Sequence, residues 1–164
     1  MDLRTEHHYP ADPDAVFGML TDPAFLRAKL EARGDTDVEV IECAPAADGY
    51  RVVTRRKVAI DVPGFARKLL NPTNTVTQTD VWSAADGGAR SGTWRVEATG
   101  VPVTMSGTMS LAATPDGCVE VIDGVVRSAV PLVGGRLEKL VGGTAERNLQ
   151  DEHDFARRWL AGSH

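Results

Sequence analysis

Apolar and polar residues alternate along several segments in the middle of the chain. The clearest run covers residues 103–111, Val-Thr-Met-Ser-Gly-Thr-Met-Ser-Leu, in which every second residue is apolar apart from Gly107. A period of two is typical of a strand with one buried and one solvated face. Segments rich in Val and Thr predict further strands, and residues 3–9 are compatible with another; these segments are 38–41, 50–55, 73–83, 92–98 and 119–126.

Short turn sequences separate these segments. They are Asp48-Gly49, Asp86-Gly87-Gly88 and Pro115-Asp116-Gly117. Parallel strands need long crossover connections, whereas these loops are short. The sequence therefore predicts an antiparallel sheet.

Two helix starts follow the first predicted strand. Asp12-Pro13 and Asp22-Pro23 each place a capping side chain before a proline that fits the first helical turn. Apolar residues then recur on one helical face in each case, and Gly34 is suited to end the second helix. We expect two short helices joined by a tight turn.

The last fifth of the chain changes to a period of three and four residues. This pattern predicts an amphipathic helix over residues 132–161, about 45 Å long at 1.5 Å per residue. A helix of this length needs a large partner, and the predicted sheet is the only one available. Its inner stripe is Leu137, Leu140, Val141, Thr144, Ala145, Asn148, Glu152, Phe155 and Trp159.

Composition narrows the function classes. The 164 residues are 42% hydrophobic and 25% charged, as in ordinary globular proteins, so we expect one domain spanning residues 1–164. A net charge of −5 argues against a nucleic-acid partner, which needs clustered basic residues. No segment approaches the roughly 20 apolar residues that cross a bilayer, and the N-terminal residues do not resemble a signal peptide. We expect a cytoplasmic protein.

Motifs for catalysis, metals or cofactors are lacking in the sequence. Cys43 and Cys118 are far apart and are expected as small buried side chains in a reducing compartment. His7 and His8 are neighbours on a predicted strand, so they face opposite sides and cannot share a metal. The segment Glu152-His153-Asp154 is expected to be solvated. We therefore assign no catalytic residue, metal ligand or cofactor.

The order of strand, two short helices, about six strands and a long terminal helix resembles the helix-grip fold of the START-like, birch-pollen-allergen-like superfamily, also called SRPBCC. Within it, the chain is similar to an uncharacterised actinobacterial family, a domain of unknown function. The residues that carry the resemblance are 12–17 (Asp-Pro-Asp-Ala-Val-Phe), 62–70 (Val-Pro-Gly-Phe-Ala-Arg-Lys-Leu-Leu), 77–82 (Thr-Gln-Thr-Asp-Val-Trp) and 131–140 (Pro-Leu-Val-Gly-Gly-Arg-Leu-Glu-Lys-Leu).

This resemblance implies an α+β fold in which a curved antiparallel sheet of about six or seven strands wraps around the C-terminal helix. It also implies a small hydrophobic ligand, because members of the superfamily bind lipids, sterols and polyketides, and some cyclise or hydrolyse them. Fold alone does not decide between these activities.

The candidate ligand contacts are the alternate strand residues expected to face the interior, together with the inner stripe of the long helix. Met105 and Met109 share one strand face, and thioether side chains adapt readily to different ligands. Gly107 and Gly142-Gly143 would leave room beside them. The alternative for every residue is plain core packing. The candidates are Phe17, Leu20, Trp94, Val96, Met105, Met109, Val121, Leu137, Val141, Thr144 and Asn148.

The segment 60–70 interrupts the strands and combines apolar with basic residues. Phe65 and Leu69 are further candidate ligand contacts, beside Arg67 and Lys68. Three interpretations are open: a lid over the cavity, an ordinary packed connection, or transient contact with an acidic membrane surface.

Four polar residues are candidates for the interior of the cavity: Arg56, Gln78, Asp80 and Asp123. A carboxylate in such a pocket would have a raised pKa and could act as an acid or base. Arg56 and Asp80 could equally form a structural ion pair.

Three functions follow from these alternatives. The favoured one is a non-catalytic carrier or sensor of a lipid-like or polyketide-like molecule. The others are a cyclase- or hydrolase-type enzyme on a similar ligand, and a protein-interaction module with a solid interior. Only the first two predict a cavity. The oligomeric state is left open.

Overall fold

The computed structural model describes residues 1–47 and 49–162. Its helices and strands follow one another in the order that the sequence predicts. In chain order they are β1 (Asp2–Tyr9), α1 (Pro13–Leu20), α2 (Pro23–Ala32), β2 (Thr36–Ala46), β3 (Gly49–Ala59), the short 3-10 helix η1 (Gly64–Ala66), β4 (Thr73–Ser83), β5 (Arg90–Ala98), β6 (Thr104–Thr114), β7 (Gly117–Arg127) and α3 (Gly134–Leu160).

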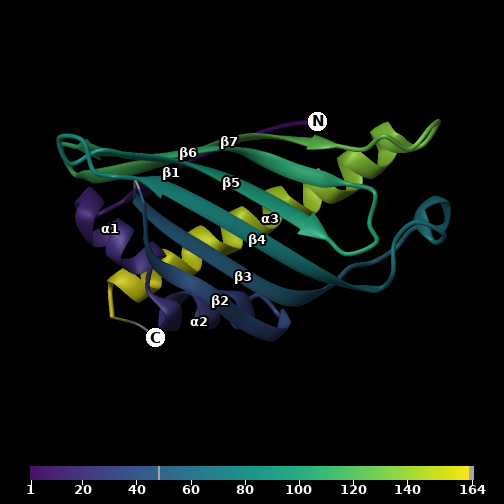
Figure 1. The fold of residues 1–164 in the computed structure, drawn as a ribbon, viewed down its shortest axis with the longest axis horizontal. Helices are drawn as coiled ribbons and strands as arrows, with labels where there is room; N and C mark the ends of the chain where they lie inside the picture. Colours follow the sequence, from purple (N-terminus) through teal and green to yellow (C-terminus); the bar gives the residue numbers. More distant parts are fainter. Residues whose placement is uncertain (48, 163–164) are drawn as a thin grey trace.

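The seven strands form one antiparallel sheet in the order β1-β7-β6-β5-β4-β3-β2. From β2 to β7 each strand pairs with its neighbour in sequence. Most of the connections are too short for a crossover, and the longer one between β3 and β4 contains η1. β1 is added at the far edge, beside β7. The sheet curves over α3, which crosses its concave side (Figure 1). The predicted α+β helix-grip architecture is confirmed. Asp48 of the predicted β2–β3 turn lies outside the described residues.

Both short helices begin as their sequences predict. The Asp12 carboxylate accepts a hydrogen bond from the Ala15 amide at 2.8 Å, and the Asp22 carboxylate accepts one from the Ala24 amide at 2.9 Å. Each helix buries its apolar face, as Val16 and Phe25 illustrate. α1 and α2 lie beside the C-terminal end of α3 (Figure 1).

The long helix begins at Gly134, two residues later than the pattern predicts. Leu132, just before it, has a φ of +68° and is fully exposed. At its buried face, Gly142 touches the N-terminal residue: a Cβ there would lie 2.3 Å from Met1 Sδ. The room expected beside Gly142 is therefore filled by Met1. Among the described residues, no helix combines the length and apolar character needed to cross a bilayer.

Two groups of buried residues hold the sheet and helices together. One, which includes Tyr9, Phe25 and Trp82, joins α1, α2 and the end of α3 to the sheet. The other surrounds the start of α3, where Ala66 and Leu70 of the segment 60–70 are buried in the same cluster as Leu137. The segment therefore packs at this end of the molecule. Whether it also opens as a lid stays a prediction.

Candidate functional site

A cavity of about 210 Å³ lies between the concave face of the sheet and α3. Most of its wall is apolar. Sites for drug-sized ligands usually measure about 300–1,000 Å³, so this cavity suits a small molecule or part of a larger one. The structure places these predicted contacts in its wall: Leu20, Trp94, Val96, Met105, Met109, Val141, Thr144 and Asn148, together with Arg56, Gln78 and Asp80.

Four other predicted contacts pack elsewhere. The ring of Phe17 lies under the Arg90 guanidinium, 3.6 Å from its carbon, and against Trp82. The ring of Phe65 is covered by Arg136 at 3.8 Å. Leu137 is fully buried in the cluster at the start of α3, and Leu69 packs against that cluster, while its neighbour Leu70 lines the cavity.

For β7, the prediction placed the wrong set of alternating residues on the side that faces the cavity. Glu120 and Ile122 line the cavity, so Val121 and Asp123 project from the outer face. Asp123 is 43% exposed and binds Arg4 at 2.5 Å. Both parities of this strand carry apolar residues, so alternation alone did not define its inner side.

Trp94 reaches across the sheet toward Gly124 of β7 and forms part of the cavity wall. Its indole Nε1 donates to the carbonyl oxygens of Thr108 and Asp123, at 3.1 and 3.2 Å. The ring fits because Gly124 has no side chain: a Cβ there would lie 2.3 Å from the ring. The absence of a side chain on β7 thus fixes the position of this tryptophan.

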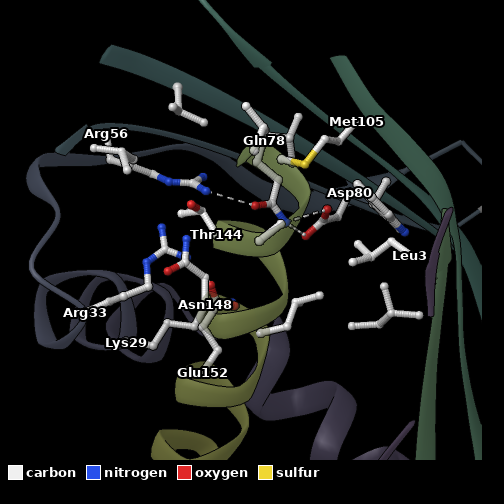
Figure 2. A pocket seen from close by; sticks show the side chains of 18 of the residues that line it. Leu3, Lys29, Arg33, Arg56, Gln78, Asp80, Met105, Thr144, Asn148 and Glu152 are labelled. Atoms are coloured by element: carbon white, nitrogen blue, oxygen red, sulfur yellow. Dashed lines mark hydrogen bonds and ion pairs between the residues drawn. The ribbon is translucent and has the colours of Figure 1, made fainter. Parts of the chain in front are cut away.

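Polar side chains cross the middle of the cavity from β3 to β4; we call Arg56, Gln78 and Asp80 the β3–β4 row. Arg56 Nη2 donates to Gln78 Oε1 at 3.3 Å, and Gln78 Nε2 donates to the Asp80 carboxylate at 3.1 Å. Figure 2 shows the row above α3, with Thr144 and Asn148 rising toward it. The alternative of a direct Arg56–Asp80 ion pair is not realised, because the neutral amide of Gln78 bridges the two side chains.

A second group of charges ties α2 to α3 beside this row; we call Lys29, Arg33, Asp35 and Glu152 the α2–α3 ion cluster. Glu152 accepts from Lys29 at 2.8 Å and from Arg33 at 2.5 Å. Arg33 also binds Asp35. The expectation that Glu152 is solvated is wrong, because its place on the inner helix stripe turns it toward α2.

Two of the carboxyl groups that line the cavity, those of Asp80 and Glu152, have opposite pKa shifts. Burial raises the pKa of Asp80 to about 6, against the lowering effect of the Gln78 hydrogen bond. Burial would also raise the pKa of Glu152, but the charges of Lys29 and Arg33 outweigh it and lower the pKa to about 2. At neutral pH Glu152 is firmly ionised, whereas Asp80 lies within reach of protonation.

A third polar group lies where β1 and β7 meet α3. Glu120 Oε2 accepts from the Tyr9 hydroxyl at 3.0 Å and lies 3.6 Å from His7 Nδ1. The His153 ring stacks on the His7 ring with centroids 4.3 Å apart. Burial, followed by the Glu120 charge, raises the pKa of Tyr9, which keeps its hydroxyl a donor. His7 is buried and His8 exposed, so the predicted opposite facing is confirmed.

Sequence reasoning missed most of these charged residues. Two signals could have found some of them. Thr144, Asn148 and Glu152 follow one another at four-residue steps inside an apolar helix face, and Lys29 and Arg33 share a face of α2. The elements that carry them are far apart in the chain, so the pairing needed the fold.

Metal binding finds no support in this geometry. Within residues 1–47 and 49–162, no three His, Cys, Asp or Glu side chains gather in a way that could hold an ion.

Solved structures with similar folds come from several organisms. The protein TTHA0849 from Thermus thermophilus has a TM-score of 0.65 at 19% identity, with 100% of both chains covered. A STAR-related lipid transfer protein from Xanthomonas axonopodis has a TM-score of 0.60 at 17% identity, covering 95% of this chain and 85% of that one. Human STARD10 has a TM-score of 0.62 at 10% identity, covering 98% and 64%.

These likenesses show the fold: the chain shares the helix-grip fold with these proteins. Residues 4–160 match the family described as "Protein of unknown function (DUF2505)", and the chain belongs to that family. No curated protein matches the chain in sequence.

Proposed function

We propose that the protein binds a small hydrophobic molecule, lipid-like or polyketide-like, in the cavity between the sheet and α3, and carries or senses it without chemistry. The observation that carries this proposal is the cavity itself, about 210 Å³ with a mainly apolar wall. A packed interaction module would fill this space with side chains, so the cavity counts against that alternative.

The wall supports reversible binding of an apolar body. Met105 and Met109 project from β6, and Val141 faces them from α3. Because thioether side chains repack at little cost, this wall suits ligands of varied shape. The lipid transfer protein from Xanthomonas axonopodis shares the fold, which agrees with a carrier role at the level of architecture.

Native mass spectrometry of the purified protein, followed by solvent extraction, tests the proposal. We expect about one hydrophobic adduct per chain. Ala145→Phe, which places a ring in the cavity wall, should abolish the adduct, whereas Gln150→Phe on the exposed side of α3 should retain it. A bare protein that also ignores a broad lipid panel would favour the interaction module instead.

An enzyme acting on a similar ligand is the second candidate, and the buried His7–Glu120 contact favours it. A carboxylate beside one ring nitrogen orients an imidazole for proton transfer by the other. Both residues line the cavity. Under this candidate His7→Gln would retain ligand binding and remove turnover; no conversion of any bound ligand by the unaltered protein would dismiss the enzyme.

In this proposal the protein is cytoplasmic and has no nucleic-acid partner. It contacts a membrane at most transiently, when it exchanges its ligand. The end of the molecule near η1 offers the exposed Leu132 and the exposed basic residues Arg67 and Lys68. Arg67→Ala combined with Lys68→Ala should weaken sedimentation with anionic vesicles and leave ligand binding unchanged. Equal sedimentation of both proteins would remove the membrane contact.

A further inference from the structure

Arg56 is a charged side chain in the cavity wall, and most of its hydrogen-bonding capacity is unused. It is 5% exposed, yet its two hydrogen bonds, to Thr54 and Gln78, are both 3.3 Å long and end on neutral oxygens. Its Nε has no hydrogen-bond partner among the described residues and lies 3.5 Å from Asp35 Oδ2. A guanidinium has five N–H donors, and leaving them unused inside a protein is costly.

The neighbouring Arg33 is paired differently, although its Nε also has no hydrogen-bond partner among the described residues. It binds two carboxylates, those of Glu152 and Asp35. Arg56 has no carboxylate within hydrogen-bond geometry among the described residues. Arg56 therefore lacks a hydrogen-bonded anionic partner, and a ligand could supply one.

Further polar groups surround the space beside Arg56. The Asn148 side chain projects from α3 toward the row, and its amide group makes no hydrogen bond with the described residues (Figure 2). Asp80 has its carboxylate turned to the Gln78 amide at 3.1 Å. An amide and a protonatable carboxyl can both donate to an oxygen held by the guanidinium.

The charge balance of this region also favours an anion. When Asp80 is protonated, three cations face two carboxylates, and one positive charge is left over. The groups counted are Lys29, Arg33 and Arg56 against Asp35 and Glu152. The other titratable groups that line the same cavity are His7, Tyr9, Glu120 and His153.

We propose that the ligand is a monoanionic amphiphile whose carboxylate binds Arg56, with its apolar chain extending along Val96, Met105 and Val141. This inference rests on the proposed function, since it names the chemical class of the molecule in that cavity. The planar fork of Arg56 matches the two oxygens of a carboxylate. The apolar residues at the η1 end of the cavity, including Ile60 and Leu70, accommodate the chain.

The test compares three probes of equal chain length: decanoate, 1-decanol and decylamine. Their affinities are measured by calorimetry with the full chain. We expect decanoate to bind about 10- to 100-fold more tightly than 1-decanol, the usual range for a hydrogen bond to a charged group. Arg56→Met should remove this preference, so that decanoate binds no more tightly than 1-decanol. Arg55→Met is the matched control, because Arg55 is exposed on the other face of β3 and binds Glu39.

A second measurement needs no variant. A bound carboxylate makes ionisation of Asp80 less favourable, so binding takes up a proton and weakens as the pH rises from about 6 to about 8. Decanoate stays ionised over this range, because alkyl carboxyl groups titrate near pH 4–5. The affinity of 1-decanol should stay constant.

The outcomes separate the two proposals. Equal affinity for decanoate and 1-decanol, or a preference for decylamine, overturns the carboxylate and leaves the hydrophobic carrier intact. Failure of all three probes overturns both. Decanoate preference that survives Arg56→Met assigns the anion to another residue and overturns the role of Arg56.

Discussion

The α2–α3 ion cluster and the β3–β4 row line the same cavity, and both contain a buried arginine and a buried carboxyl group. In the first, Arg33 and Glu152 bind each other directly at 2.5 Å. In the second, Gln78 separates Arg56 from Asp80. The first arrangement satisfies its charges within the protein and fastens two helices. The second leaves donors and a protonatable carboxyl facing the cavity, which is what a site for an outside polar group requires.

The largest effect should come from breaking the ion cluster. Glu152→Gln leaves the buried charges of Lys29 and Arg33 without their shared partner, and we expect a loss of about 3–5 kcal/mol in the free energy of unfolding. Urea denaturation measures it. Glu146→Gln, exposed on the same helix, should change stability by less than about 0.5 kcal/mol. Equal effects would mean that the cluster does not stabilise the fold.

Acid should break the same cluster without a mutation. The pKa of Glu152 is about 2 in the folded protein and lies near the ordinary value of 4.5 when unfolded. Its contribution is therefore complete above about pH 4.5 and is lost as the pH falls toward 2, by roughly 3 kcal/mol. Unfolding curves of the native protein and Glu152→Gln between about pH 5 and pH 2 should converge; parallel curves would contradict the lowered pKa.

Asp80 should act in the opposite direction. Its pKa of about 6 exceeds the ordinary 3.8, so the protonated form is favoured in the folded protein. Its ionisation therefore costs stability as the pH rises from about 4 through 6. Asp80→Asn should raise the unfolding free energy at pH 8 by about 1–2 kcal/mol, since contact with the cavity moderates the burial, and change little at pH 4. Destabilisation at pH 8 would show that the ionised carboxylate is needed.

The smallest effect should follow from replacing the weakly bonded arginine. Arg56→Met loses two long hydrogen bonds and relieves a buried charge, so we expect a change within about 1 kcal/mol. Arg33→Met should cost about 3 kcal/mol or more, because it removes the direct partner of Asp35 and one of the two cations bound to Glu152. Thermal unfolding at pH 7 measures the stability of both variants. Equal losses of stability would contradict the predicted difference between the two arginines.

The sequence predicted most of the fold, because each element carries its own local signal. Asp12 and Asp22 cap helices regardless of what those helices contact, and residues 103–111 alternate cleanly. β7 shows the limit. Apolar residues on both of its parities left the inner face undefined, and this error misplaced Val121 and Asp123.

The site was less predictable, because its charged part depends on contacts between distant segments. Glu152 and Arg33 are 119 positions apart, and the sequence around either residue does not indicate that the other is its partner. The β3–β4 row was easier, since Gln78 and Asp80 share one face of a single strand. Its bridged geometry still depended on the register that places Thr54 opposite Gln78.

The position of Trp94 has an optical consequence. The chain contains three tryptophans, and two of them, Trp82 and Trp94, line the cavity, where both are almost completely buried. The indole ring of Trp94 is held in place by the two carbonyl oxygens that accept from its nitrogen. A molecule entering the cavity replaces solvent or empty space beside these rings, so their fluorescence emission reports occupancy directly. The protein thus contains its own spectroscopic probe for screening ligands, with no added dye and no change to the sequence.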